Sequence, residues 1–417
     1  MRSFSVSLAV LVGVVMACGS QTVVPSPSTP PPGSPGPTVT ANPTPTATTN
    51  PTPTVTPTPS ATNRPHAWVQ VKTSDSGEYI TGQVFASSTG YVLFYVPNCF
   101  GPCGLGALYS SDGLDWHSAG LLPATGYPYD VTSVTEYAGG LIAAGRVGAG
   151  SCTPWGGCDS AEGVLWRSRY EGRNWQRVAW SFDAGPVYDG DIGGGLLAVA
   201  SVDGRLLTVG ERLSGKDQQH SSSDIELWTS TDSVTWTQVN DPNTPPTNTS
   251  GLHDIILIGA TQFMLADEGD ATGITPAVDV SADTMDWTLI GMGEPASRTV
   301  PYLRQILAYP GGYVALGGVA GSMHELVLSS PDGRSWSGAP DALPDSPHGW
   351  QAAVVGDEIM AISNAGIYVS TDGLNWNRAF VSLPTTDIGQ VISDGSSVLV
   401  VDSVTGQIWR ADAAALR

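Results

Sequence analysis

One short motif recurs along this chain of 417 residues and constrains its fold more than any other feature. Each copy joins a serine, an acidic residue and a tryptophan within seven or eight positions. The copies are SSDGLDW ending at Trp116, STDSVTW at Trp236, SADTMDW at Trp287, SPDGRSW at Trp336, STDGLNW at Trp376 and a looser SRYEGRNW at Trp175. Successive tryptophans lie 40 to 61 residues apart, so the chain is an array of similar units with connections of variable length.

Every unit repeats one order of predicted strands. In the unit that contains Trp287, the first two strands are DIILIGA and FMLADEG, the third, AVDVSAD, enters the motif, and the fourth, WTLI, leaves it. Glycine, aspartate or serine lies at the turns between them. Four short antiparallel strands, repeated every 40 to 60 residues, predict an all-β fold of the β-propeller class.

The repeats predict seven blades. After the six motifs, a seventh group of strands follows, DIGQVIS, VLVVDSV and GQIWRAD, but the chain ends before a fourth strand. The segment HAWVQV, near the start of the globular region, has the pattern of a fourth strand, with Trp68 in the place of the motif tryptophan. We therefore expect the N-terminal strand to complete the last blade and close the ring, which removes the open sheet edges. Six or eight blades are the alternatives.

The motif resembles the Asp-box, or BNR repeat, of sialidase-like propellers. In that family the boxes are structural and lie on the face opposite the ligand site. The resemblance therefore implies a structural role, rather than calcium binding or catalysis, for the box residues. They are Asp112 with Trp116, Glu171 with Trp175, Asp232 with Trp236, Asp283 with Trp287, Asp332 with Trp336 and Asp372 with Trp376. Aspartate and glycine also suit a tight turn, because the carboxylate accepts backbone N–H groups and glycine adopts positive φ.

The first 17 residues are typical of an export signal. Arg2 precedes an apolar run that ends at Met16, and this run is much shorter than the ~20 residues that a bilayer crossing requires. Ala17 and Cys18 then resemble the lipobox of bacterial lipoproteins, which implies lipidation of Cys18 and anchoring to the outer face of a bacterial membrane. An ordinary signal peptide with an incidental cysteine is the alternative.

A segment rich in proline and threonine follows the signal. Residues 18–65 contain runs such as ANPTPTATTNPTPTVTPTPS, which offer no aromatic side chains to bury and are predicted to stay extended. We expect a stalk, or a plain spacer, between Cys18 and a propeller domain that spans residues 66–417.

The remaining four cysteines form two closely spaced pairs. Cys99 and Cys103 lie in one predicted loop, and Cys152 and Cys158 lie in the corresponding loop of the next blade. In an exported protein the simplest prediction is two local disulfides; pairing between the two loops is the alternative. Neither spacing is that of a structural zinc site.

The candidate ligand face is predicted from the same geometry. Loops between second and third strands, and loops between blades, share the face opposite the motifs. Candidate carboxylates at the starts of inner strands are Asp130, Asp191, Asp254 and Asp387, and candidate aromatic surface is offered by Tyr129, Trp155 and Trp350. Ordinary solvated loops are the alternative.

The net charge and the absence of certain motifs exclude several classes of function. A net charge of −21 and the absence of a basic stripe argue against nucleic-acid binding. The histidines show no metal-ligand spacing, so neither a metal nor a cofactor is predicted. The few arginines are not distributed as the sialidase substrate triad requires. The sequence therefore predicts a surface-anchored, non-catalytic propeller that binds a protein partner or glycan. The alternatives are a sialidase-like glycoside hydrolase, whose usual mechanism needs only two carboxylates, and an assembly factor for a membrane complex.

Overall fold

The fold is described from a computed structural model. It describes residues 67–71, 82–95, 104–123, 127–152, 158–186, 194–215, 221–239, 257–259, 262–267, 277–284, 286–292, 301–319, 324–339 and 342–417. The predicted export signal, Cys18 and the Pro/Thr-rich segment lie outside these residues, as do Cys99, Cys103, Trp155, Asp191 and Asp254.

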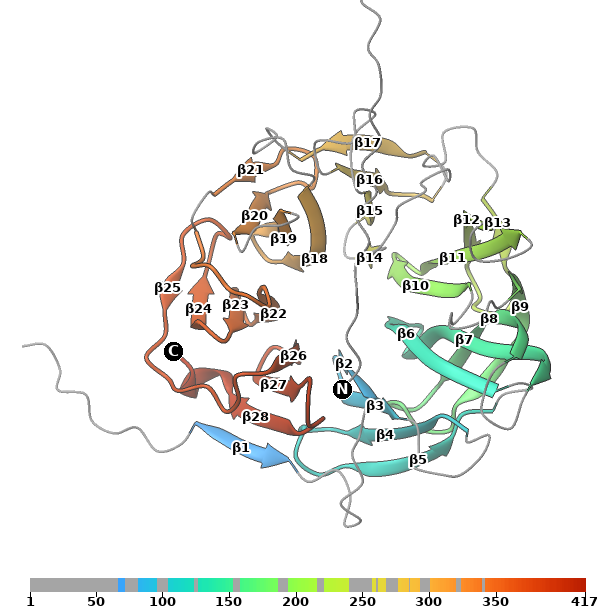
Figure 1. The fold of residues 1–417 in the computed structure, drawn as a ribbon, viewed down its shortest axis with the longest axis horizontal. Helices are drawn as coiled ribbons and strands as arrows, with labels where there is room; N and C mark the ends of the chain where they lie inside the picture. Colours follow the sequence, from blue (N-terminus) through green and yellow to red (C-terminus); the bar gives the residue numbers. More distant parts are fainter. Residues whose placement is uncertain are drawn as a thin grey trace, which may run out of the picture. The chain divides into compact units, whose positions relative to one another are not determined.

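Seven antiparallel sheets of four strands form a ring (Figure 1). Blade 1 is β2 (Gly82–Ser87), β3 (Gly90–Tyr95), β4 (Gly106–Ser110) and β5 (His117–Leu121). Blade 2 is β6 (Tyr127–Tyr137), β7 (Gly140–Cys152), β8 (Cys158–Ser168) and β9 (Gln176–Pro186). Blade 3 is β10 (Gly195–Val202), β11 (Arg205–Gly215), β12 (Ser221–Ser230) and β13 (Thr237–Gln238). Blade 4 is β14 (Leu257–Gly259), β15 (Phe263–Asp267), β16 (Ala277–Ser281) and β17 (Thr288–Gly291).

The remaining blades follow the same order. Blade 5 is β18 (Pro301–Tyr309), β19 (Gly312–Val319), β20 (Glu325–Ser330) and β21 (Ser337–Gly338). Blade 6 is β22 (Gln351–Val355), β23 (Glu358–Ser363), β24 (Gly366–Ser370) and β25 (Asn377–Arg378). Blade 7 is β26 (Ile388–Ser393), β27 (Ser397–Asp402), β28 (Ile408–Asp412) and β1 (Trp68–Val71), and a short 3-10 helix (Ala413–Ala415) follows β28. The prediction of a seven-bladed, all-β propeller is confirmed.

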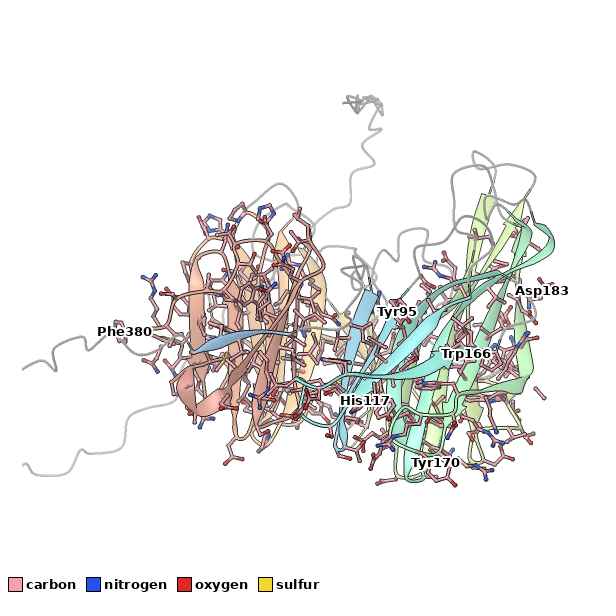
Figure 2. The ribbon with its side chains drawn as sticks, turned by 90° about the horizontal axis from the view of Figure 1, so that it is seen from below. Tyr95, His117, Trp166, Tyr170, Asp183 and Phe380 are labelled. Atoms are coloured by element: carbon pink, nitrogen blue, oxygen red, sulfur yellow. The ribbon has the colours of Figure 1, made fainter. Side chains whose placement is uncertain are left out.

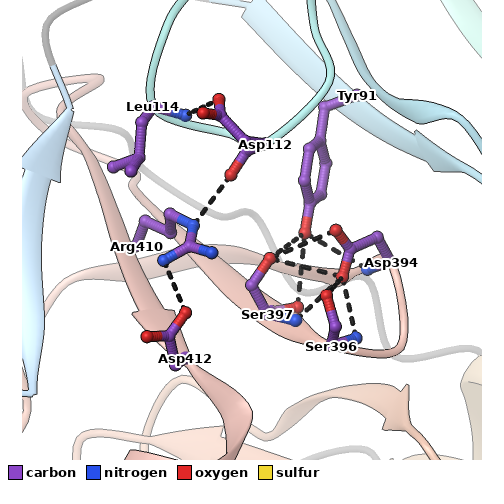
Figure 3. Close-up of polar contacts among 8 residues, drawn as sticks. All are labelled: Tyr91, Asp112, Leu114, Asp394, Ser396, Ser397, Arg410 and Asp412. Carbon is purple, nitrogen blue, oxygen red and sulfur yellow. Dashed lines mark hydrogen bonds and ion pairs between the residues drawn. The ribbon is translucent and has the colours of Figure 1, made fainter.

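The N-terminal strand completes the last blade, as predicted. Strand β1 pairs antiparallel with β28, with Trp68 opposite Ala411 and Val71 opposite Ile408. Beside this junction, the hydroxyl of Tyr91 in blade 1 hydrogen-bonds to Ser397 of blade 7 at 2.9 Å (Figure 3). The two ends of the described chain therefore meet in one sheet, and every blade has a neighbour on each side.

Apolar side chains fill the space between neighbouring blades. Between blades 5 and 6, for example, Val314 and Leu316 of β19 pack with Ala352 of β22 and with Ile359 and Ala361 of β23. Second strands such as β19 bury residues on both faces of their sheet, so they read as apolar runs such as YVALGG rather than as a strict alternation. The ring is held mainly by this burial.

The predicted turns have one recurring hydrogen-bond pattern. In blade 6, Oδ1 of Asp372 accepts the backbone N–H groups of Leu374 and Asn375 at 2.9 and 2.8 Å, and the Ser370 hydroxyl donates to it at 3.1 Å. The serine hydroxyl accepts the N–H of Gly373, which has φ of 73°. The same bonds recur around Asp112, Asp232 and Asp332, and around Asp283 over its described residues. Serine and aspartate therefore saturate the donors of each turn.

Blade 2 departs from that pattern. The carboxylate of Glu171 lies 3.3 Å from the guanidinium of Arg173, and both side chains are about half exposed. The turn is instead held by the Ser168 hydroxyl, which donates to the carbonyl of Arg173. The glutamate side chain is longer and the turn has one extra residue, so the carboxylate points outward. Glu171 therefore does not accept the backbone N–H groups of its turn in the way that the aspartates of the other turns do.

The turns of blades 1, 3, 4, 5 and 6 are also bound by the preceding blade. The backbone carbonyl of the aspartate, or of the residue before it, accepts a side-chain donor from the neighbour. The donors are Arg410 to Asp112 at 2.8 Å, Tyr137 to Thr231, Arg205 to Asp283 at 2.6 Å, Gln262 to Asp332 at 2.8 Å and Ser329 to Asp372 at 2.8 Å. The turns therefore join neighbouring blades as well as neighbouring strands.

Glutamines join the first strands of neighbouring blades. Gln305 of β18 donates to the carbonyl of Ala352 at 2.8 Å and accepts its N–H at 3.0 Å. Gln390 of β26 makes the same pair of bonds with Val84 of β2, at 2.8 and 3.1 Å. Each glutamine directly follows a β-bulge, where one strand carries an extra residue. Its amide thus acts like one more peptide group between blades.

Candidate functional site

The two faces of the ring differ in what they present. Turns between first and second strands, and between third and fourth strands, lie on one side, which we call the motif face. The connections between second and third strands, and between blades, lie on the other, which we call the loop face. Tyr170 and Asp183 mark the two ends of blade 2, the first toward the motif face and the second toward the loop face (Figure 2).

Among the described residues, the strands of blades 2 and 3 extend furthest on the loop face. Strand β7 has 13 residues and β8, β9 and β11 have 11 each, whereas the second strands β3, β23 and β27 have 6. The added length lies beyond Arg146 in β7 and beyond Gly210 in β11, away from the motif turns. The loop face therefore has a raised side, formed by two blades.

A disulfide between Cys152 and Cys158 fits the backbone at the tip of that raised side. The two residues end β7 and begin β8, and they lie opposite each other in the strand register. Directly opposite residues of an antiparallel pair have Cα atoms about 4.5 to 5.5 Å apart, which is within the range that a disulfide bridges. The backbone register thus favours the local pairing predicted for these two cysteines.

Asp130, which was predicted to contact a ligand, forms an ion pair with Arg146 of its own blade. Its Oδ1 accepts Nε of Arg146 at 3.0 Å, and a second guanidinium nitrogen contacts Oδ2. Arg146 also covers Gly195 at the start of blade 3, where a Cβ atom would collide with its side chain. The carboxylate therefore positions an arginine between blades 2 and 3.

Asp387 is exposed at the entrance to β26. Its backbone carbonyl accepts the N–H of Ser403 at 2.8 Å, and its own N–H donates to the Thr385 hydroxyl at 3.2 Å. The backbone is thus fixed while the carboxylate reaches solvent. Tyr129 lies in β6, but its side chain is outside the described part of the structure.

Trp350 does not offer aromatic surface on the loop face, so the prediction for this residue is wrong. Its side chain is fully buried, its indole N–H donates to the carbonyl of Pro344 at 2.9 Å, and its ring meets the edge of Tyr368 at a centroid distance of 5.3 Å. The segment between blades 5 and 6 folds back over the sheet, so a residue beside an inner strand lies in the core.

A buried ion pair lies beside Trp350, and the sequence analysis missed it. Glu325, the first residue of β20, has a side chain only 2% exposed and lies 3.2 Å from Nη1 of Arg304. Burial raises the pKa of Glu325 to about 7, although the Arg304 charge acts in the opposite direction. In sequence the two residues look like ordinary charged surface positions.

A second ion pair lies between the raised blades. Nε of Arg212 is 3.1 Å from Oε1 of Glu226, Oε2 accepts the side-chain amide of Gln238 at 2.9 Å, and the guanidinium lies 5.4 Å from the ring of Phe182 in blade 2. Burial raises the pKa of Glu226, while Arg212 lowers it and the nearby Asp224 raises it further. The pair is therefore part of the contact between blades 2 and 3.

The described residues contain no group of three or more histidine, cysteine, aspartate or glutamate side chains placed to hold a metal ion. None of their helices has the length and apolar character needed to cross a membrane.

Comparisons with known proteins give similarity in structure only. No protein-family model matches the chain, and no curated protein matches it in sequence.

The solved structures that are similar include sialidases and other glycoside hydrolases. A Trypanosoma rangeli sialidase in complex with 2,3-difluorosialic acid is 11% identical, with 80% of this chain and 60% of that chain covered and a TM-score of 0.43. The GH93 α-L-arabinofuranosidase of Fusarium graminearum is 14% identical, with 70% and 96% covered and a TM-score of 0.42. The GH32 β-fructofuranosidase BmSUC1 of Bombyx mori is 14% identical, with 79% and 88% covered and a TM-score of 0.33. At identities and scores this low, the similarity does not extend to activity or ligand.

Proposed function

We propose that this chain is an Asp-box propeller that binds a protein partner or a glycan through its loop face and carries out no catalysis. Lipidated Cys18 and the Pro/Thr-rich stalk would hold it on the outer face of a bacterial membrane. The difference between the two faces supports this proposal above all. On the motif face, serine and aspartate side chains saturate the turn donors, and turn carbonyls accept hydrogen bonds from the preceding blade. On the loop face, the strands of blades 2 and 3 project beyond the other described strands.

The described arginines favour binding over sialidase-like hydrolysis. That mechanism needs several arginines directed at one substrate carboxylate. Arg146, Arg212 and Arg304 each lie instead against a carboxylate of their own blade, at Asp130, Glu226 and Glu325. Each is thus already used within the protein's own structure.

A screen of the full-length protein with oxidised cysteines tests the proposal. It combines a glycan array, a panel of glycosidase substrates and capture of partners from the bacterial surface. Binding to a glycan or one specific surface protein, without turnover, is the expected result. Turnover of a glycoside would overturn the non-catalytic assignment.

Matched variants then locate the site. Asp224→Asn with Asp387→Asn removes two exposed carboxylates from the loop face, and Asp115→Asn with Asp286→Asn removes two from the motif face. The first pair is expected to weaken binding at least severalfold, and the second to leave it unchanged. Equal loss in both pairs, or loss in the second alone, would contradict the assignment of the loop face.

A further inference from the structure

The motif turn of blade 2 differs from the other motif turns in its charge. Residues 167–173, RSRYEGR, contain three arginines and one glutamate, which gives a local net charge of +2. The whole chain carries a net charge of −21, and among the other five motifs only SPDGRSW contains a basic residue, Arg334. One turn therefore presents a cluster of positive charge on a protein that is acidic overall.

Most of this positive charge is not neutralised within the protein. No carboxylate of the described residues pairs with Arg167, which is partly buried, or with Arg169, which is exposed. Arg173 lies 3.3 Å from the carboxylate of Glu171, but the two side chains are 47% and 52% exposed, so water screens their attraction. A negatively charged ligand would therefore compete with one weak ion pair at most.

The turn holds its charged side chains against blade 1. The guanidinium of Arg173 lies 4.4 Å from the centre of the Tyr109 ring, which is a cation–π contact. The backbone N–H of Arg173 donates to the carbonyl of Tyr170 at 2.7 Å. Gly172 has φ of 82° and lies so close to Val92 that a Cβ atom would collide with it. Because the turn is fixed in this way, a ligand meets a prearranged surface.

Tyr170 adds an exposed aromatic ring between the arginines. Its side chain is 63% exposed and lies at the motif-face end of blade 2 (Figure 2). Tyrosine and arginine are enriched among the residues that contribute most to binding at protein interfaces. We call this surface the arginine patch, and it consists of Arg167, Arg169, Tyr170, Glu171 and Arg173. Its composition is typical of a protein interface.

The number of charges favours a peptide over a membrane or a nucleic acid. Anionic lipid surfaces are bound by clusters of about four to eight basic residues, and nucleic acids by a longer array of phosphate contacts. The arginine patch has three arginines, and the carboxylate of Glu171 among them repels phosphate groups. A short peptide segment with a few carboxylates matches this charge, since a guanidinium binds a carboxylate through two parallel hydrogen bonds.

We propose that the arginine patch is a second binding surface, on the motif face, for an acidic segment of a protein partner. Carboxylates of that segment bind Arg169 and Arg173, and an apolar side chain packs on the ring of Tyr170. The patch lies at the opposite end of blade 2 from the raised side of the loop face (Figure 2). Binding at the patch therefore does not depend on which ligand the loop face binds, or on whether it binds one.

Fluorescence anisotropy with the full-length protein tests the proposal. The probe is a fluorescein-labelled octapeptide with several glutamates and a central leucine, in buffer with physiological salt, and the reference is the same peptide with glutamine in place of glutamate. The acidic peptide is expected to bind about tenfold more tightly than the reference, or better, because only its carboxylates form charge-assisted hydrogen bonds. Equal affinity for the two peptides would overturn the proposal.

Matched variants separate the patch from general charge attraction. Arg169→Glu reverses a charge that has no described partner, so it should keep the wild-type melting temperature and weaken binding of the acidic peptide by about tenfold or more. Tyr170→Ala should weaken binding as well. Arg334→Glu, the same change in the motif turn of blade 5, is the control and should bind as wild type. Equal weakening by Arg169→Glu and Arg334→Glu would overturn the proposal.

A vesicle assay distinguishes an acidic peptide from an anionic lipid surface. The wild-type protein and Arg169→Glu are compared on vesicles with and without phosphatidylglycerol. The substitution is expected to leave vesicle binding unchanged, because the anionic ligand of the patch is a peptide. Loss of phosphatidylglycerol-dependent binding in Arg169→Glu, with peptide binding unaffected, would overturn the proposal and assign the patch to lipid.

Discussion

The guanidinium of Arg410 donates a hydrogen bond of 2.8 Å to the backbone carbonyl of Asp112, although 298 residues separate them in sequence (Figure 3). Arg410 lies in the last blade and Asp112 in the first motif turn. The bond is thus one of the five hydrogen bonds that join the aspartate turns to the preceding blade, and it acts where the ring closes.

Loss of this bond should weaken the closed ring. Arg410→Ala removes the donor to Asp112 and the 2.7 Å ion pair with Asp412. We expect the free energy of unfolding to fall by about 1 to 3 kcal/mol, because a partly buried carbonyl loses its partner. Urea denaturation measures the change. Arg334→Ala is the control, since Arg334 lies at the tip of the blade 5 turn, and equal destabilisation by both variants would contradict the ring-closure role.

The glutamines of the inner strands provide a second test of how the blades are joined. Gln390→Ala leaves the N–H and the carbonyl of Val84 without their side-chain partner. The free energy of unfolding is expected to fall by about 1 to 3 kcal/mol. Gln305→Ala, which removes the partner of the Ala352 N–H and carbonyl, should lower it by a similar amount. Gln83→Ala, at an exposed position of β2, should have little effect. Melting curves at one pH compare the three; wild-type behaviour of Gln390→Ala would refute the role of the amide.

Acid should weaken the motif turns. Hydrogen bonds from the N–H and side chain of Asn375 hold the pKa of Asp372 at about 2, below the 3.8 of a solvated aspartate. A lowered pKa stabilises the fold fully above pH 3.8, and that stabilisation is lost as the pH falls through 2. Asp372→Asn keeps an acceptor without the titration, so the fall in melting temperature between pH 4 and 2 should be shallower. Asp115→Asn changes a residue that contributes its backbone N–H, and not its carboxylate, to a motif turn, so it should keep the wild-type slope.

The tip of blade 2 should contain a disulfide. Peptide mapping without reduction should join the peptides of Cys152 and Cys158, whose backbones lie opposite each other. Replacing both cysteines with serine should cost about 2 kcal/mol by loop-closure entropy. A map that joins Cys152 to Cys99 or Cys103 would instead support the cross-link between blades 1 and 2.

The sequence predicted the features that depend on neighbouring residues. The turn around Asp372 involves positions within six residues, so a motif is enough to predict it. Ring closure by the strand that contains Trp68 was predicted because the last blade lacked a fourth strand. The segment HAWVQV, near the start of the globular region, has the pattern of that missing strand. Blade count and closure thus followed from repetition.

Features that depend on distant contacts could not be predicted in this way. The burial of Trp350 depends on how the preceding segment folds over blade 5, and no local pattern marks that path. Glu325 and Arg304 are 21 residues apart, and nothing in sequence shows that a bulge and a strand start bring them together. Glu171 matched the motif by type, but its longer side chain turned outward.

The completion of blade 7 by β1 has a consequence for the order in which the protein is made. Synthesis proceeds from the N-terminus, so β1 is the first of the described strands to be made, yet its partner β28 is the last of them. Blades 1 to 6 each consist of consecutive strands and can form as they emerge. The first strand must wait unpaired until nearly the whole chain has been released, and only then can the ring close.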